Sequence, residues 1–144
     1  MAEIELGLAK SARPAYGFDD VAVVPTRRTR DSDVVSLAWQ IDAFRFDIPL
    51  LGAPTDSVMS PRTAIALGRA GGLGVLNLEG VWTRYDDPEP LLAEIAGLPA
   101  DVATNRMREI YAAPVRPDLI RQRLAEIREA GVTVAGSLSP QAVQ

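Results

Sequence analysis

Residues 46–80, FDIPLLGAPTDSVMSPRTAIALGRAGGLGVLNLEG, hold two short apolar segments separated by a helix signal. The first segment, residues 48–53, is a continuous apolar run of strand length, which is typical of a parallel sheet covered on both faces. The second segment, residues 73–76, has the same character. Residues 48–77 therefore predict one strand, helix and strand unit, and this unit restricts the chain to folds that contain a parallel sheet.

The helix between these strands has a defined start and a defined stop. Ser60 can accept hydrogen bonds from the first free amides, and Pro61 stands where no amide partner is needed. Leu67 lies on the apolar side of this helix, and Gly71 supplies the stop. The remaining sequence predicts a short helix at 90–96, a turn-rich helix at 102–112, a helix at 117–130, a strand at 132–136 and a helix start at Ser139-Pro140.

Strands and helices alternate in this prediction, and each turn from a strand to a helix is polar. That alternation is typical of an α/β fold with a parallel sheet, whose strand carboxyl ends lie on one face. A complete (β/α)8 barrel takes about 250 residues, and the chain has 144. We therefore expect the N-terminal part of a TIM barrel, about three of eight units. Residues 48–144 would form these units, and residues 1–47 an N-terminal extension of short strands that caps the barrel.

Two strand features are expected within the extension. Val21 to Val24 form a short apolar run closed by Pro25, which predicts a strand. Residues 34–49, VVSLAWQIDAFRFDIP, contain two apolar stretches separated by Asp42 and predict a short hairpin. The three arginines of the loop 27–30 could hold a phosphate, but solvation or ion pairing is the simpler interpretation.

The composition excludes several kinds of chemistry. The chain has no cysteine and no histidine, so thiolate catalysis, disulfides and histidine-based metal or acid–base sites cannot occur within it. The net charge of −4, without a run of like charges, makes nucleic acid and anionic membranes unexpected partners. Neither a signal peptide nor the roughly 18 apolar residues of a membrane span are present. We therefore expect a cytoplasmic protein.

The stretch GAPTDSV, which follows the first buried strand, is the first candidate site. Ligands of parallel α/β folds bind outside the carboxyl ends of the strands, where Ala53 to Ser57 are expected. Small residues let a ligand approach the backbone, Thr55 can offer a hydroxyl, and Asp56 can accept hydrogen bonds. Asp56 could equally cap a nearby loop or helix through its neighbours' amides, and the sequence alone leaves both roles open.

The stretch GGLGVLNLEG is the second candidate. Its glycines precede a strand and Asn77 takes the place of the third glycine, so a dinucleotide-binding fingerprint is rejected. Asn77 and Glu79 follow the strand and can face the same ligand as Asp56, although ordinary turn chemistry is slightly favoured. The adjacent carboxylates at 19–20 and 86–87 have neither metal nor glycosidase spacing, so no metal site is expected.

Three sequence blocks resemble the N-terminal part of the IMP dehydrogenase and GMP reductase family. They are FDDVAVVP at 18–25, IPLLGAPTDSV at 48–58 and AIALGRAGGLGVLN at 64–77. In that family an F-D-D-V-x-x-x-P strand precedes a P-M-D-T-V-type turn, an A-x-A helix and a G-G-x-G strand, in the same order. One branch of the family lacks the regulatory CBS pair, and four stretches are similar to it: PTRRTR, AWQIDAFRF, PTD and REIYAAPVRPDLI. The interval 77–132 also has no room for a CBS pair.

The resemblance implies a reaction on a purine mononucleotide, IMP or GMP. A cysteine on the loop after the sixth strand attacks C2 of the purine, and hydride passes between that carbon and NAD or NADP. IMP dehydrogenases hydrolyse the covalent adduct, whereas GMP reductases expel ammonia and return IMP. It also implies a homotetramer for the full-length form. Because this chain has no cysteine, it holds no catalytic residue, and we expect an inactive fragment that is poorly soluble or partly folded on its own.

The resemblance also assigns nucleotide-binding residues. The turn after the first strand contacts the nucleotide through residues that match Ala53 and Thr55, and the match of Asp56 lies near the ribose or supports the turn. Asn77 and Glu79 complete the expected site. The family's usual Met is Thr55 here and a frequent Ser is Ala53, so purine packing and hydrogen bonding at this turn differ from the family pattern.

Two other functions are open. A flavin-dependent barrel of the nitronate monooxygenase type, which binds FMN, also has a Pro-containing turn after its first strand and an A-G-G-L-G strand soon after. The FDDVAVVP block and Asp56 argue against it. A non-catalytic paralogue that binds a purine nucleotide without turnover is compatible with the substitutions at Ala53 and Thr55.

Overall fold

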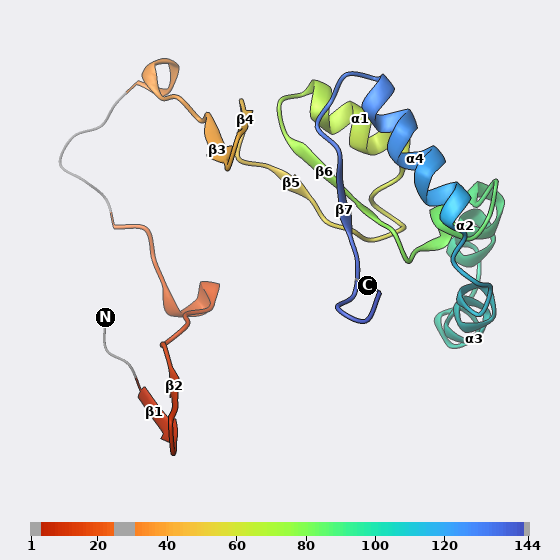
Figure 1. Cartoon of the computed structure of the whole chain (residues 1–144), viewed down its shortest axis with the longest axis horizontal. Coiled ribbons are helices and arrows are strands. Elements are labelled where there is room, and N and C mark those ends of the chain that lie inside the picture. Colours follow the sequence, from red (N-terminus) through yellow and green to blue (C-terminus); the bar gives the residue numbers. More distant parts are fainter. Residues whose placement is uncertain (1–3, 25–30, 143–144) are drawn as a thin grey trace. The chain divides into compact units, whose positions relative to one another are not determined.

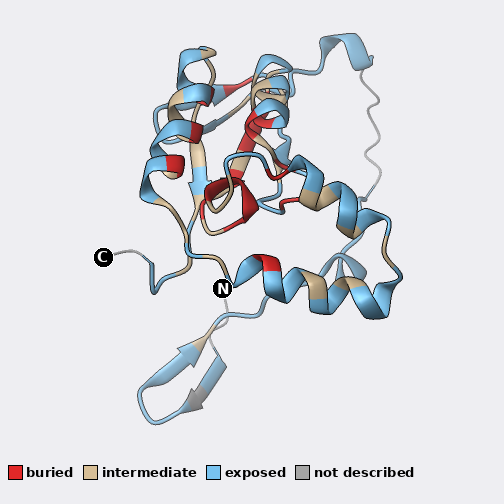
Figure 2. Ribbon diagram, turned by 90° about the vertical axis from the view of Figure 1, so that its right-hand side faces the viewer, coloured by how far each residue is buried: buried red, intermediate tan, exposed pale blue. Residues whose placement is uncertain are grey.

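The computed structural model describes residues 4–24 and 31–142 and divides into two compact units (Figure 1). Unit 1 comprises residues 1–35 and unit 2 residues 36–144. Among the described residues, all the buried ones belong to unit 2 (Figure 2). The core and the candidate site therefore lie in unit 2.

Unit 1 contains one hairpin and two single turns. Strand β1 (Ile4–Gly7) pairs antiparallel with β2 (Lys10–Ala12), and the 3-10 turns are η1 (Phe18–Asp20) and η2 (Ser32–Val34). The prediction of a strand at 21–24 is wrong, because these residues are irregular and exposed. β-branched residues form a strand only where a partner strand supplies hydrogen bonds and packing, and no strand pairs with this run in the described part of unit 1. The arginine loop at 27–30 lies outside the described residues.

Unit 2 begins with the predicted hairpin. Strand β3 (Trp39–Ile41) pairs antiparallel with β4 (Phe44–Phe46), which confirms the prediction for residues 34–49. Asp42 has a φ of 50° in the connecting turn, a conformation that aspartate tolerates better than most residues. The rings of Trp39 and Phe46 stack with centroids 5.1 Å apart, so the hairpin has its own aromatic contact.

A three-stranded parallel sheet follows, in the order β5 (Leu51–Gly52), β6 (Leu73–Asn77) and β7 (Ala135–Ser137). The register pairs Leu51 with Leu73 and Asn77 with Ser137. The strand predicted at 48–53 is thus reduced to two residues, and the strand predicted at 132–136 begins three residues later. Leu51 is half exposed, so one face of this edge strand is not covered.

The helices occur where the sequence predicts them, with small changes at their ends. They are α1 (Pro61–Arg69), α2 (Glu89–Ala96), α3 (Ala100–Tyr111) and α4 (Pro117–Glu129), and a 3-10 turn η3 (Val81–Thr83) follows β6. The Ser60 side chain accepts a hydrogen bond from the Thr63 amide at 3.1 Å, and Gly71 follows α1 with a φ of 87°. The Ser139-Pro140 pair forms a turn, and no helix follows it within the described residues.

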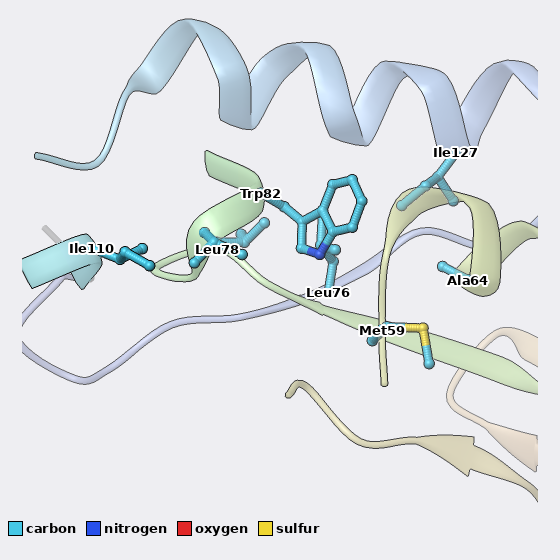
Figure 3. Packing of buried hydrophobic residues seen from close by; sticks show 8 residues of the cluster. Met59, Ala64, Leu76, Leu78, Trp82, Ile110 and Ile127 are labelled. Atoms are coloured by element: carbon cyan, nitrogen blue, oxygen red, sulfur yellow. The ribbon is translucent and has the colours of Figure 1, made fainter. Parts of the chain in front are cut away.

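The core lies between β6, η3 and the helices α1 and α4 (Figure 3). It contains Met59, Ala64, Leu76, Leu78, Val81, Trp82, Ile110 and Ile127. A Cβ on Gly74 would lie 2.6 Å from the Ala64 Cα, so only glycine lets α1 approach β6 this closely. Gly74, within β6, therefore serves helix packing, which agrees with the rejection of a dinucleotide fingerprint.

Candidate functional site

A cavity of about 560 Å³ lies at the carboxyl ends of β5 and β6, on the edge of the sheet where α/β barrels place their ligands. Two groups of residues line it. The loops after the strands contribute Pro54, Thr55, Asp56, Ser57, Asn77 and Val81, and the helices α2 and α3 contribute Leu92, Ile95, Ala96, Met107 and Tyr111. The cavity thus has a polar wall on the strand side and a mainly apolar wall on the helix side.

Three of the five predicted site residues line this cavity. Thr55 and Asp56 reach it from the loop after β5, and Asn77 from the end of β6. Ala53 is exposed in the same loop but does not line the cavity, and neither does Glu79. The parallel register, which pairs β5 with β6, brings residues together that are more than twenty positions apart.

The loop at 53–57 is a compact turn. The Thr55 amide donates to the Ala53 carbonyl at 2.8 Å, and the Thr55 carbonyl accepts from the amides of Val58 and Met59 at 2.9 and 2.8 Å. The Thr55 side chain is exposed, and its hydroxyl has no hydrogen-bond partner within the described residues. The turn therefore fixes the backbone and leaves this hydroxyl free for a ligand.

Asp56 joins the ends of β5 and β6. Its Oδ2 accepts a hydrogen bond from the Val81 amide at 2.9 Å and a second one from the Tyr111 hydroxyl. Only 9% of the residue is exposed, and Oδ1 has no hydrogen-bond partner in the described part of the chain. Since a Cβ on Gly80 would overlap the carboxylate, that glycine is required for the close approach. The carboxylate accepts from the first amide of η3, which lies 25 positions away, whereas the capping role left open by the sequence was through the amides of its own neighbours.

Asn77 and Glu79 form the turn that the sequence favours. The Asn77 Oδ1 accepts from the Glu79 amide at 3.0 Å, and the Glu79 carboxylate accepts from the amide and the hydroxyl of Ser139. Arg84 donates to the Glu79 carbonyl from Nε at 3.1 Å and from Nη2 at 2.9 Å. Glu79 thereby connects the ends of β6 and β7, while Asn77 faces the cavity. Their contact with a nucleotide stays a prediction.

The sequence reasoning missed Tyr111, which lines the cavity, and Arg84, which contacts the Tyr111 ring. Burial and, second to it, the hydrogen bond to Asp56 raise the pKa of the Tyr111 hydroxyl above its ordinary value. The Arg84 guanidinium lies 5.5 Å from the centre of the Tyr111 ring, within cation–π distance. The contact between Tyr111 and Asp56 spans 55 positions, and no local sequence pattern signals it.

The described ranges, 4–24 and 31–142, contain no group of three acidic side chains placed to hold a metal ion. None of the described helices combines the length and the hydropathy that a membrane crossing requires.

Successive parallel strand and helix units, with polar residues gathered at the strand carboxyl ends, define the first part of an α/β barrel. The model of the IMP dehydrogenase / GMP reductase domain matches residues 15–135, and the chain belongs to this family. The family prediction is therefore confirmed.

Relatives match this chain over nearly its whole length or over about half of it. An uncharacterized oxidoreductase of Mycolicibacterium smegmatis is 47% identical over 98% of this chain and 39% of its own length. The inosine-5'-monophosphate dehydrogenase of Escherichia coli is 37% identical over 49% of this chain and 14% of its own length. The chain thus spans about two fifths of the length of the oxidoreductases that it matches throughout.

A solved structure confirms the predicted fold. The crystal structure of an IMP dehydrogenase/GMP reductase-like protein from Corynebacterium glutamicum is similar with a TM-score of 0.81 and 40% identity. The similarity covers 98% of this chain and 39% of the other. The chain has the α/β fold of the first part of a TIM barrel.

Proposed function

We propose that the whole protein is a purine-nucleotide oxidoreductase that interconverts IMP, GMP or XMP with NAD or NADP, and that this chain supplies part of the mononucleotide site. One observation carries the proposal: Thr55, Asp56 and Asn77, from two neighbouring strands, line one cavity at the carboxyl edge of the sheet. The family match and the oxidoreductase relatives support the reaction class.

The cavity suits the uncharged part of a nucleotide. The free hydroxyl of Thr55 and the amide of Asn77 can bond to a ribose or a base, and Leu92, Ile95 and Met107 offer an apolar surface to a flat ring. Among the described residues, no arginine or lysine lines the cavity, so this lining supplies no cation for a phosphate. We therefore expect the 5'-phosphate to be held by residues other than those that line this cavity.

The polar groups that line the cavity do not fit a nicotinamide dinucleotide. A pyrophosphate requires cations or the free amides of a helix N-terminus, and the residues that line the cavity supply neither group. We assign no residue of this chain to the cofactor. The chain has no cysteine, so the covalent step of the family reaction belongs to another part of the whole protein. We further propose that the whole protein is a cytoplasmic homotetramer, which light scattering and cell fractionation would test.

The test follows nicotinamide absorbance when the purified whole protein is mixed with IMP, GMP or XMP and with each form of NAD and NADP. We expect one nucleotide and cofactor pair to react, and residues 1–144 alone to give no turnover. Nucleotide binding without absorbance change would identify a non-catalytic paralogue, and a bound flavin would identify an FMN enzyme. Turnover by residues 1–144 alone would refute the assignment of the covalent step to another part of the protein.

The variant Thr55→Met places the family's usual residue in the loop after β5. We expect it to change the KM for the nucleotide by roughly three- to tenfold while the KM for the nicotinamide cofactor stays constant, because only the nucleotide contacts this loop. Thr104→Met, at an exposed position of α3 outside the cavity, is the matched control. Equal effects of the two variants would remove Thr55 from the site.

A further inference from the structure

We propose that Tyr111 is a positioning residue: its hydroxyl holds the Asp56 carboxylate, and helix α3 thereby sets the position of the loop at 53–57. The inference rests on the proposed function in so far as this loop borders the nucleotide. The contact joins the last residue of α3 to the loop after β5, two segments that are far apart in the sequence.

The Asp56 carboxylate depends on few donors. Within the described residues its Oδ2 receives the Val81 amide and the Tyr111 hydroxyl, while Oδ1 is buried without a partner. A buried carboxylate that loses one of two donors is poorly compensated, and it regains hydrogen bonds most readily by turning toward water. Such a rotation of the Asp56 side chain would move Thr55 as well, because Thr55 precedes Asp56 in the same tight backbone turn.

Tyr111 is suited to this role by its own surroundings. It lines the cavity and is 38% exposed, so it contacts the site rather than only filling the core. A tyrosine hydroxyl is protonated at neutral pH, and burial raises the pKa of Tyr111 further, so the hydroxyl can donate to the carboxylate. The Arg84 guanidinium, which stacks on the ring, is itself held by the carbonyls of Glu79 and Ala113.

Helix α3 can hold Asp56 firmly because it is fixed near its carboxyl end and in its middle. Near its carboxyl end, the Tyr85 hydroxyl donates to the Ile110 carbonyl at 2.8 Å, and Ile110 is buried in the core. In its middle, Arg106 donates to both carboxylate oxygens of Glu94 on α2, at 2.6 and 3.0 Å. The pair of helices that forms the outer wall of the cavity therefore also fixes the residue that supports its polar wall.

The test compares Tyr111→Phe with Tyr85→Phe in the whole protein. Both variants remove one hydroxyl that anchors the end of α3, but only Tyr111 contacts Asp56. We expect Tyr111→Phe to raise the hydrogen-exchange rate of the Val81 amide and of the loop at 53–57, and to weaken binding of IMP or GMP about tenfold in calorimetry. Tyr85→Phe loosens the end of α3 without removing a donor to Asp56, so its effect on both readouts should be clearly smaller than that of Tyr111→Phe.

A double-mutant cycle of Tyr111→Phe with Asp56→Asn guards against a general loss of stability. If the two residues act through each other, the exchange effects of the two changes will be strongly non-additive. Additive effects, or exchange in Tyr111→Phe equal to that in Tyr85→Phe, would overturn the inference. Absence of nucleotide binding in the unmodified protein would instead refute the proposed function, while the exchange rates still decide whether Tyr111 positions Asp56.

Discussion

Units 1 and 2 use apolar residues in opposite ways. In unit 1, Phe18 and Val23 are each 98% exposed, whereas Leu76 and Val81 of unit 2 are fully buried. Both regions have apolar runs that predict strands, but of the two runs only the one in β6 has parallel partners on both sides and a helix, α1, packed against it. The difference shows that an apolar run becomes a strand through its neighbours more than through its own composition.

The largest expected effect is a loss of packing at Leu76. Leu76→Ala removes a fully buried side chain from the middle of β6 and should destabilise the protein by about 2–5 kcal/mol. Val23→Ala removes an exposed side chain of unit 1 and should change stability by less than about 0.5 kcal/mol. Urea unfolding of the two variants measures the difference, and equal losses would contradict the contrast between the units.

Much of unit 2 could be predicted because its signals are local. Ser60 and Gly71 cap a helix by hydrogen bonds and backbone conformation within a few residues, and Asp42 lies in a turn between adjacent strands. The sequence also predicted that Thr55 and Asn77 lie at the same edge of the sheet, because parallel strands place their carboxyl ends at one edge.

Other features depend on contacts that no single segment encodes. The hydrogen bonds from Tyr111 to Asp56 and from Ser139 to Glu79 join positions 55 and 60 residues apart. The same reason explains the error at residues 21–24, where a strand-forming composition has no partner strand in the described part of unit 1.

The second-largest expected effect is a loss of stability on substitution of Gly80, compared with Gly17, a glycine in an equivalent conformation. Gly17 and Gly80 each precede a 3-10 turn with φ of −78° and −85°. A Cβ on Gly17 would meet the Asp20 carboxylate at an ordinary 3.5 Å, whereas a Cβ on Gly80 would overlap Asp56. Gly80→Ala should therefore cost about 1–3 kcal/mol by overpacking, and Gly17→Ala should be neutral or slightly stabilising. Thermal unfolding checks this order, and a larger loss for Gly17→Ala would reverse the comparison.

The smallest expected effect is an acid sensitivity of the α2 and α3 pair in unit 2. The hydrogen bond from Arg106 lowers the pKa of Glu94 below its ordinary 4.5. Because the pKa of Glu94 is lower in the folded than in the unfolded state, its ionised carboxylate stabilises the folded protein. This stabilisation is present above pH 4.5 and is lost as the pH falls through the folded-state pKa. Circular dichroism of the whole protein should show a small acid loss of helix that Glu94→Gln removes. An unchanged acid profile in that variant would exclude Glu94 as its source.

The central claim is that the loop around Thr55 borders a purine mononucleotide at the mouth of the barrel. A crystal structure of the whole protein with IMP or GMP bound tests it most directly. The account predicts that the base or the ribose contacts the loop at 53–57 and lies beside Asn77. A nucleotide bound at another edge of the barrel, without contact to this loop, would contradict it.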